Sequence, residues 1–445
     1  MCIKASNFFY LLIFMYFLGC IYIVNATETY EPKTSFEIPC SFNPVGSGAR
    51  AIGMSSFLGV ADDATATSWT PGGLSNLDFC EISLVLSNTN RKEKNRFNAS
   101  NYDMNWTDSS SRTEIDLFSI AIPFEVLQKI MALSITKQRF YDLNRTWKFK
   151  LNNNDQLNSF DENYWTYAQE GDLSALSISY SIDINSFALG FSLNIWRDSC
   201  LTPNKWKQTY YNKRIGLMNG KLLEYSYKKI EQYNFDGVNY NIGLRWNINS
   251  NFALGLVYKA DFKAKVEHII KINNKQSQIR EEKIKMPKSY GIGLSYRANN
   301  NLTISGGIYQ TNWNEFAYFN SGGNITNPIS GTLLKDSHMK PTKQMRLGFE
   351  YFFINNLNYN YNIPIRGGVF IDPIPSEGSS DNVYGISIGF GFNKSKYSID
   401  VAYQHRFANN VGTSYLNHLD YSQDINEGKL YTSLIIYFDD YAPKF

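Results

Sequence analysis

The sequence predicts an all-β fold, a 14-stranded antiparallel transmembrane β-barrel with an N-terminal hatch (plug) in its lumen. Three observations lead to this prediction. Apolar and small polar residues alternate through many segments of about ten residues, which is the period of a strand. Aromatic residues gather near the ends of these segments, and long connections alternate with short ones along the 445-residue chain. The prediction divides the chain into residues 1–26, 27–78 and 79–445.

Residues 1–26 are predicted to form a secretory signal peptide. An apolar run extends from Phe8 to Val24 after one lysine, and the small residues that follow predict cleavage after Ala26. A retained membrane anchor is the alternative, because about 18 apolar residues suffice to cross a bilayer. No later run is as long, so an exported chain would be either a soluble protein or a β-barrel in an outer membrane.

Residues 27–78 are predicted to form the hatch. The stretch GVADDATATSWTPGGL, residues 59–74, is small and polar and follows neither the helix nor the strand period. Asp62 or Asp63 is expected to cap a short helix over residues 64–69, which the following Pro-Gly-Gly stops. A barrel of this size is too wide for its own side chains to fill, so a small polar segment fits its lumen.

Residues 79–445 contain the alternating segments. In ALSISYSID, residues 175–183, apolar side chains share one face and serines share the other. In a soluble sandwich the apolar face would meet a second sheet, whereas in an outer-membrane barrel it meets lipid and the small polar face lines the lumen. The fourteen predicted strands are 79–87, 114–124, 130–140, 174–183, 187–196, 237–248, 252–262, 288–297, 302–312, 343–353, 363–371, 382–392, 397–407 and 429–438.

Strand length and loop rhythm favour the barrel over the sandwich. A tilted strand needs about 9–11 residues to cross a bilayer, while strands in globular proteins average about 5–6. Aromatic residues near strand ends, such as Trp196, Trp246 and Tyr258, suit the girdles at membrane interfaces. Short turns follow the even strands and long external loops follow the odd ones, as a barrel requires. These predicted loops are 88–113, 141–173, 197–236, 263–287, 313–342, 372–381 and 408–428.

The composition excludes several functional classes. A net charge of +3 argues against nucleic acid as a partner. The four histidines are scattered and have no Cys or His at metal-ligand spacing, so we expect no metal, no cofactor and no catalytic residue. Beyond the signal peptide only Cys40, Cys80 and Cys200 remain, and a Cys40–Cys80 disulfide and three free thiols are both open.

Residues 43–77, NPVGSGARAIGMSSFLGVADDATATSWTPGGLSNL, resemble the hatch of the FadL/TodX (OmpP1) family of outer-membrane transporters for hydrophobic compounds. The family pattern is Gly-Ala-Arg-Ala-Leu-Gly-Met-Gly, then Val-Ala-Asp-Asp-Ala, then Trp-Asn-Pro-Ala-Gly-Leu. Thr-Pro-Gly stands here where the family has Asn-Pro-Ala, which removes an amide side chain. Residues 286–313 and 366–392 are similar to the family's Pro-containing strand pair and its late Pro-x-Pro loop.

The resemblance implies a 14-stranded barrel in the outer membrane of a Gram-negative cell. It also implies transport of long-chain fatty acids or aromatic hydrocarbons, with capture on external loops, a shift of the hatch and lateral release near the third strand. The implied partners are a hydrophobic small molecule, outer-membrane lipid and lipopolysaccharide, and the chain is expected to be a monomer. The hatch or gating residues that the resemblance implies are Asp62, Asp63, Trp69, Thr70, Pro71 and Gly72.

Two groups of residues are predicted to contact the ligand. The loop 197–236 carries many apolar residues, which form either a capture surface or a small core of the loop itself. Its candidates are Leu217, Met218, Leu222 and Leu223. Alternation places charged side chains in the lumen, namely Arg245, Lys259, Asp261, Arg346, Glu350, Arg366, Asp400 and Arg406. Arg346 and Arg366 are predicted to bind a carboxylate ligand, and pairing with other charges or with the hatch is the alternative.

A porin for small polar solutes is the main alternative function, and a structural or adhesive role for the external loops comes third. The hatch discriminates between the first two, because an open porin has no use for a plug. The third strand, 130–140, holds no Gly or Pro that would mark a kink beside a lateral opening.

Overall fold

The computed structural model describes residues 45–99, 102–151, 162–218, 221–356, 361–378, 381–412 and 421–438. The predicted signal peptide, residues 1–26, lies outside these ranges, and residues 36–445 form one compact unit. Among the described residues, the structure has no helix of the length and apolar character that a membrane span requires.

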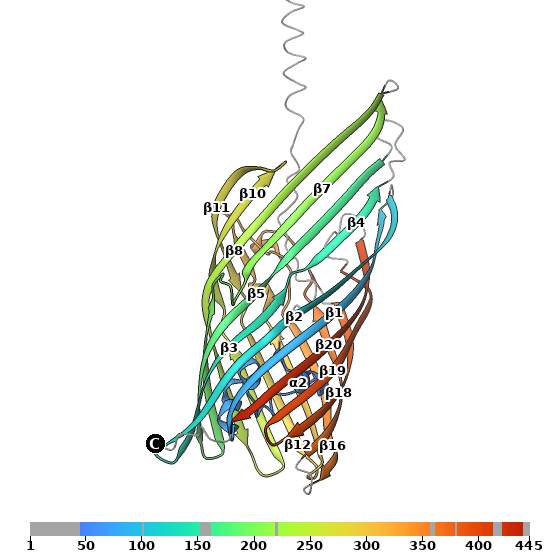
Figure 1. The fold of residues 1–445 in the computed structure, drawn as a ribbon. Coiled ribbons are helices and arrows are strands. Elements are labelled where there is room, and N and C mark those ends of the chain that lie inside the picture. Colours follow the sequence, from blue (N-terminus) through green and yellow to red (C-terminus); the bar gives the residue numbers. More distant parts are fainter. Residues whose placement is uncertain are drawn as a thin grey trace, which may run out of the picture. The chain divides into compact units, whose positions relative to one another are not determined.

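Within the described ranges, twenty strands form one antiparallel sheet that closes on itself, since β1 (Cys80–Ala99) pairs with both β2 and β20 (Figure 1). The other strands are β2 (Tyr102–Val126), β3 (Lys129–Asp142), β4 (Arg145–Leu151), β5 (Glu162–Ile184), β6 (Phe187–Trp196), β7 (Asn204–Met218), β8 (Lys221–Asn247), β9 (Phe252–Lys259), β10 (Phe262–Ile272), β11 (Lys275–Met286), β12 (Ser289–Arg297), β13 (Leu302–Thr311), β14 (Ala317–Phe319), β15 (Ile325–Thr326), β16 (Thr342–Asn356), β17 (Tyr361–Ile374), β18 (Asp381–Lys394), β19 (Tyr397–Val411) and β20 (Tyr421–Phe438).

The sheet has fourteen positions around the barrel, as predicted. Four positions are each built from two consecutive strands, β3 with β4, β6 with β7, β9 with β10, and β11 with β12. The short strands β14 and β15 lie in the segment between β13 and β16, with the 3-10 helices η2 (Trp313–Glu315) and η3 (Leu334–Asp336). The predicted fold class is therefore confirmed.

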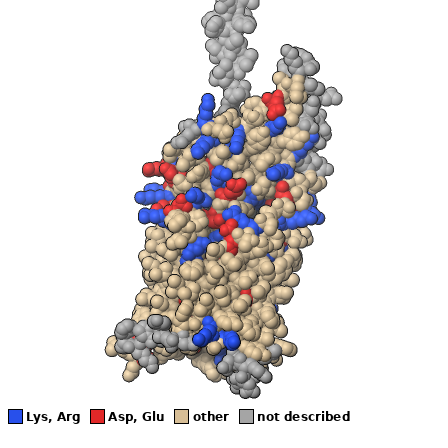
Figure 2. Space-filling view, in the orientation of Figure 1, with Lys and Arg blue, Asp and Glu red and all other residues tan. Residues whose placement is uncertain are grey.

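The two faces of the wall have the polarity expected of a barrel in lipid. On β5, Ile178 and Tyr180 are 46% and 38% exposed, while Ser177, Ser179 and Ser181 are buried. The same arrangement recurs around the barrel, so apolar side chains form an outer belt and small polar side chains face the lumen. Figure 2 shows charged side chains gathered toward one end of the face in view, next to a broad zone that has few of them.

Several predicted external loops are strands instead. The ladder of β1 and β2 continues to the pair of Ala99 and Tyr102, and that of β7 and β8 to the pair of Met218 and Lys221. The predicted loops 88–113, 141–173, 197–236 and 263–287 thus consist largely of hairpins that extend the barrel wall. The outer faces of these segments are largely polar, while their inner faces mix buried apolar residues such as Trp206, Tyr233 and Val266 with buried polar ones, and cross-strand pairing holds them in the sheet.

Candidate functional site: the hatch and an adjoining pocket

The hatch, which the structure describes from Val45 to Leu77, lies inside the barrel and is almost entirely buried. It contains the short helices α2 (Ala49–Gly53) and α3 (Ala66–Trp69) and the 3-10 helix η1 (Pro71–Asn76). Hydroxyl side chains of the wall bind its backbone and side chains. Ser433 accepts from the Ala49 N–H (2.7 Å), and Ser295 donates to the Gly59 carbonyl (2.9 Å).

Arg50 joins the hatch to the wall by ion pairs. Its Nη1 donates to Asp62 (2.6 Å), and its Nε and Nη2 donate to the two oxygens of Glu350 (3.0 Å each). Glu350 also accepts from Arg366 Nε (2.6 Å), and Arg366 Nη1 donates to Asp400 (2.6 Å). Buried charges are tolerated when each is paired, and this chain of alternating charges meets that condition.

Asp63 shapes the turn before α3 rather than capping the predicted helix. Its Oδ1 accepts from the N–H (2.8 Å) and the hydroxyl (2.5 Å) of Thr65. The helix begins only at Ala66 and has no side-chain cap, so the expected capped helix over residues 64–69 is wrong in this detail. The reason is that Arg50 holds Asp62, while Asp63 bonds within its own turn.

The remaining predicted hatch residues lie at contacts between the hatch and the wall. Trp69 is fully buried, donates from Nε1 to the Ser47 carbonyl (2.8 Å), and packs edge-on against Tyr309 of β13. Thr70 donates to the Leu256 carbonyl of β9 (2.9 Å). A Cβ on Gly72 would lie 2.8 Å from the Ala188 carbonyl oxygen, so the backbone touches β6 there. The gating role of these residues stays a prediction.

Arg346 and Arg366 both face the lumen, as alternation predicted. Arg346 donates from Nη1 to the Ser55 carbonyl of the hatch (3.2 Å) and lies over the Phe370 ring. Arg366 is fully buried among carboxylates. Their contacts are those of the alternative interpretation, with the hatch and with other charges, and a role in ligand binding stays a prediction.

Asp261 is an exception among the predicted lumen charges. It pairs with Lys285 (3.1 Å) and is more exposed than the others. Lys259 and Phe262 both line the pocket described next, although two residues separate them. The break between β9 and β10 therefore shifts the alternation and turns Asp261 outward.

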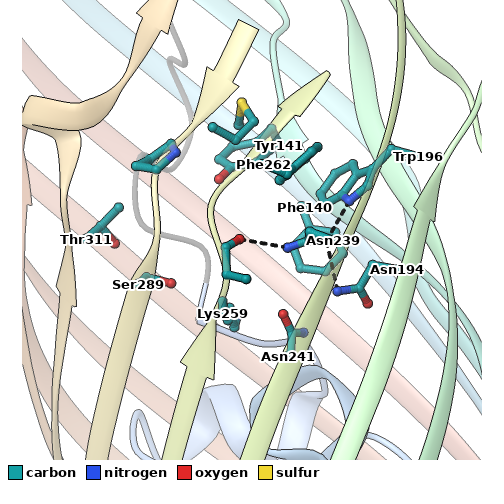
Figure 3. A pocket seen from close by; sticks show the side chains of 13 residues that line it. Phe140, Tyr141, Asn194, Trp196, Asn239, Asn241, Lys259, Phe262, Ser289 and Thr311 are labelled. Atoms are coloured by element: carbon teal, nitrogen blue, oxygen red, sulfur yellow. Dashed lines mark hydrogen bonds between the residues drawn. The ribbon is translucent and has the colours of Figure 1, made fainter. Parts of the chain in front are cut away.

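A pocket opens beside the hatch and is lined from β3, β6 and β8 through β13 (Figure 3). Its cavity of about 40 Å³ has room for little more than one or two water molecules. It combines aromatic, amide and apolar side chains with one lysine. The described lining is Phe140, Tyr141, Asn194, Trp196, Asn239, Asn241, Lys259, Ala260, Phe262, Met286, Pro287, Ser289 and Thr311.

Hydrogen bonds orient the polar part of this pocket. Asn239 Oδ1 accepts from Trp196 Nε1 (2.9 Å) and from Asn194 Nδ2 (3.0 Å), as Figure 3 shows. Lys259 donates to the carbonyl of Val45 in the hatch (2.9 Å), and its ammonium lies 5.7 Å from the Phe140 ring centre. Lys259 is the charged residue of the described lining, and the hatch contacts it directly.

The backbone pairing between β2 and β3 ends next to this pocket. The ladder between β2 and β3 ends at the pair of Leu117 and Gln138, and the register of β3 against β5 shifts at Phe140. Leu143 and Asn144 then separate β3 from β4. The predicted third strand has this break without a Gly or Pro. An Asn144 side chain that accepts from the Gly171 N–H (3.0 Å) and donates to its carbonyl (3.2 Å) fixes the turn instead.

The predicted capture residues lie at the tip of the β7–β8 hairpin. Leu222 and Leu223 are 69% and 37% exposed. The backbones of Leu217 and Met218 belong to β7, and their side chains lie outside the described part of the chain. Of the three cysteines, Cys200 is an exposed free thiol and Cys40 lies outside the described ranges, so the disulfide alternative stays open.

A buried histidine that the sequence did not single out joins the wall extensions beyond the apolar belt. His268 of β10 lies 2.9 Å from Glu282 of β11 and 3.3 Å from Glu231 of β8, and it stacks on Tyr233. The Tyr318 hydroxyl donates to Glu282. Burial lowers the pKa of His268, but hydrogen bonds and charges from both glutamates outweigh burial and leave that pKa raised. Among the described residues, no group of three or more His, Cys, Asp or Glu could hold a metal ion.

This cluster predicts a pH-dependent stability of the β8–β10–β11 extension. The raised pKa of His268 means that its contribution is complete below its ordinary pKa and is lost as pH rises through the raised value. Despite burial, His268 keeps the pKa values of Glu231 and Glu282 lowered, so their contribution is lost in acid. We expect amide exchange of residues 262–286, corrected for intrinsic rates, to quicken above neutral pH. His268→Gln should abolish this increase in amide exchange with pH. The same increase in that variant would contradict the role given to His268.

A comparison with protein families decides the identity of the chain. The family described as "Outer membrane protein transport protein (OMPP1/FadL/TodX)" matches residues 43–431. The chain belongs to this family. The FadL/TodX resemblance that the hatch sequence suggested is thus confirmed, and so is the predicted outer-membrane location. No curated protein matches the sequence.

Solved structures share the fold of this FadL/TodX family member at low sequence identity. A FadL homologue of Pseudomonas aeruginosa has a TM-score of 0.58 at 13% identity, over 91% of this chain and 99% of that one. The toluene transporter TodX of Pseudomonas putida has a TM-score of 0.53 at 13% identity, over 89% and 99%. The CymD monoaromatic hydrocarbon channel has a TM-score of 0.51 at 12% identity, over 90% and 100%. The family consists of transport proteins for hydrophobic or aromatic compounds, and this chain is one of its members.

Proposed function

We propose that the protein carries hydrophobic molecules with an anionic head, such as long-chain fatty acids, across the outer membrane. The observation that carries this proposal is Lys259, a lysine within an aromatic and amide pocket that donates to the Val45 carbonyl of the hatch. A carboxylate is a stronger acceptor for an ammonium group than a carbonyl, so an anionic ligand would compete with the hatch for Lys259.

The hatch argues against the porin alternative. Its residues fill the lumen at the level of the belt and bind wall groups from β5 to β20. In the described part of the chain, buried hatch side chains such as Trp69 and Leu58 occupy space inside the barrel that an open porin would leave free for a polar solute. The pocket itself is too small for a fatty acid, so binding requires Val45 and its neighbours to move.

We further propose that the ligand leaves sideways, between β2 and β3. Phe140 and Tyr141 line the pocket and lie at the register shift of β3, which makes the path from pocket to wall short. An apolar solute gains from entering the membrane directly and avoids water on the way. Arg346 and Arg366 would meet a ligand only after the hatch has shifted, because both now contact the hatch or its ion-pair partners.

Capture by exposed Leu222 and Leu223 at the β7–β8 tip is part of the same proposal. Such apolar residues on an external hairpin offer a first contact to a hydrophobic molecule. The closed β1–β20 seam leaves the barrel without a free sheet edge there for a second copy, which supports a monomer.

Replacing Lys259 tests the proposal. Lys259→Met keeps an unbranched apolar stem without the ammonium group, and we expect it to weaken the binding of a long-chain fatty acid roughly tenfold, the cost of one charge-assisted bond. Binding of a neutral aromatic such as toluene should change little. Titration calorimetry on the purified protein measures both ligands.

The matched control is Lys288→Met, which removes a lysine that pairs with Glu315 and is not in the pocket lining. Equal losses in both variants would contradict a specific role of Lys259. Tight binding of toluene with no measurable binding of fatty acid would favour aromatic hydrocarbons as substrates. Large steady conductance of the wild type in planar bilayers, without ligand binding, would support the porin.

A further inference from the structure

The outer face of the β10–β11 hairpin carries two cross-strand pairs of lysines. Lys263 lies opposite Lys285, and Lys265 lies opposite Lys283. Alternation places all four on the outward face, while Ala264, Ile284 and Met286 are buried on the inner one. Like charges directly opposite each other destabilise an antiparallel pair, so two consecutive lysine pairs need a compensating partner.

The protein itself compensates only part of this charge. Lys285 pairs with Asp261 (3.1 Å) and Glu315 (3.4 Å), and the Lys263 ammonium lies 4.8 Å from the Phe319 ring centre. Lys265 and Lys283 make no ion pair with any residue that the structure describes. Both are exposed.

Neighbouring carboxylates do not fill the gap. Lys265 lies opposite Asp236 of β8 in the ladder, but that carboxylate accepts from Arg197 Nε (3.1 Å). Glu267 and Glu281 form the next outward pair of the hairpin. Glu267 accepts from Asn234 (2.7 Å), and neither glutamate comes within ion-pair distance of a lysine in the described ranges. The four lysines, Lys263, Lys265, Lys283 and Lys285, therefore keep an excess of positive charge.

These four lysines lie just beyond the apolar belt, on the side of the long hairpins. Tyr258 and Tyr290 pair across β9 and β12 and are the last aromatic residues of the belt in these strands. Lys263 follows Tyr258 by five residues and Lys285 precedes Tyr290 by five, which corresponds to roughly 12 Å along the membrane normal for tilted strands. Lysine stems extend several ångströms toward the interface, so the ammonium groups reach the headgroup layer.

We propose that Lys263, Lys265, Lys283 and Lys285 form a binding site for the phosphate groups of an outer-leaflet lipid, a phosphorylated glycolipid of the lipopolysaccharide type. Three features select this ligand. The charge is complementary, the site is at headgroup height, and the lysines lie nearer the belt than the two glutamates. A phosphate bridging Lys265 and Lys283 converts their repulsion into two charge-assisted contacts.

The variant Lys265→Gln/Lys283→Gln tests the site and spares the ion pairs of Lys285. With purified rough lipopolysaccharide added to the detergent-solubilised full chain, we expect its affinity to fall roughly tenfold or more. Without lipid, the same variant should unfold at an equal or higher temperature than the wild type, because the repulsion between the pairs is relieved. A merely structural role of the lysines predicts a loss of stability instead.

Two comparisons make the outcome specific. Lys205→Gln/Lys207→Gln is the matched control, since these exposed lysines of the outer wall already pair with Asp198 (3.2 Å) and Glu170 (2.9 Å) and should leave lipopolysaccharide affinity unchanged. Dephosphorylated lipopolysaccharide should bind the wild type as weakly as phosphorylated lipopolysaccharide binds the variant. Unchanged affinity in the double variant, equal losses in the control, or equal binding of the dephosphorylated lipid would overturn the proposal. If the double variant does not fold, the single variants Lys265→Gln and Lys283→Gln give the same test.

Discussion

The substitution Gly190→Val is expected to displace the hatch from the lumen and to open the barrel to ions. A Cβ on Gly190 of β6 would lie 2.2 Å from the Pro71 carbonyl carbon and 2.3 Å from the Gly72 nitrogen. All three of its nearest atoms belong to the hatch, so the clash pushes on the plug and leaves the strand in place. A penalty of about 3 kcal/mol, the upper range for overpacking, corresponds to a roughly hundredfold larger population of unseated hatch.

Conductance in planar bilayers measures this effect. Gly255→Val should act in the same way, because a Cβ there would lie 2.0 Å from the Leu58 carbonyl oxygen. Gly306→Val is the control, since a Cβ at this position meets nothing closer than 3.5 Å, a methyl group of Leu347 on the wall. If the Gly190→Val variant conducts no ions and its hatch keeps the native protection from hydrogen exchange, the clash is relieved without displacement of the hatch.

Glu350→Gln is expected to loosen the hatch without disrupting the barrel. Glu350 is 2% exposed and neutralises two arginines, Arg50 of the hatch and Arg366 of the wall. Removing one member of a buried ion-pair network leaves uncompensated charge and costs about 3–5 kcal/mol. We expect hydrogen exchange in residues 45–77 to quicken, while exchange in the belt strands stays slow.

Glu427→Gln provides the matched control for this change. Glu427 is equally buried and accepts from Arg91 (3.2 Å) and Arg406 (2.9 Å), and both of these arginines belong to the wall. Its loss should destabilise the barrel without selective exposure of the hatch. Equal exchange of the hatch in both variants would mean that Arg50 and Glu350 do not anchor it.

Alternation along the chain predicted the barrel because one rule governs every belt strand. Once Ser177, Ser179 and Ser181 share a face, that face is either solvent or lumen, and the loop rhythm decided between them. The same rule fails where the strand breaks, so Asp261 faces outward although simple parity places it inside. The extended hairpins were missed because charged and amide residues are mixed into their alternation, although inner side chains such as Val266 and Ile270 are buried.

The candidate site was only partly predictable for a related reason. The alternation along a strand shows which side chains face the lumen. It does not show which of them contact the hatch and which border a cavity. Arg346 and Arg366 lie against the hatch and its partners, whereas Lys259 borders the pocket. The break after Asp142 had no Gly or Pro to mark it, and its turn depends on a contact between Asn144 and the distant Gly171. That contact exists only in the folded sheet.

The contacts that hold the hatch differ from one side of the barrel to the other. On the side of β16 and β17, charged groups grip it through Arg50 and Glu350. On the side of β8 and β9, the contacts include single hydrogen bonds, from Arg245 and Lys259 to carbonyl oxygens of the hatch and from Thr70 to the Leu256 carbonyl. We expect the hatch to rotate about the ion pair between Arg50 and Glu350 when the hydrogen bond from Lys259 to the Val45 carbonyl breaks. We therefore expect the ion pairs of Arg50 to keep the hatch attached to the wall while the single hydrogen bonds on the opposite side break, so that the barrier can return after each passage.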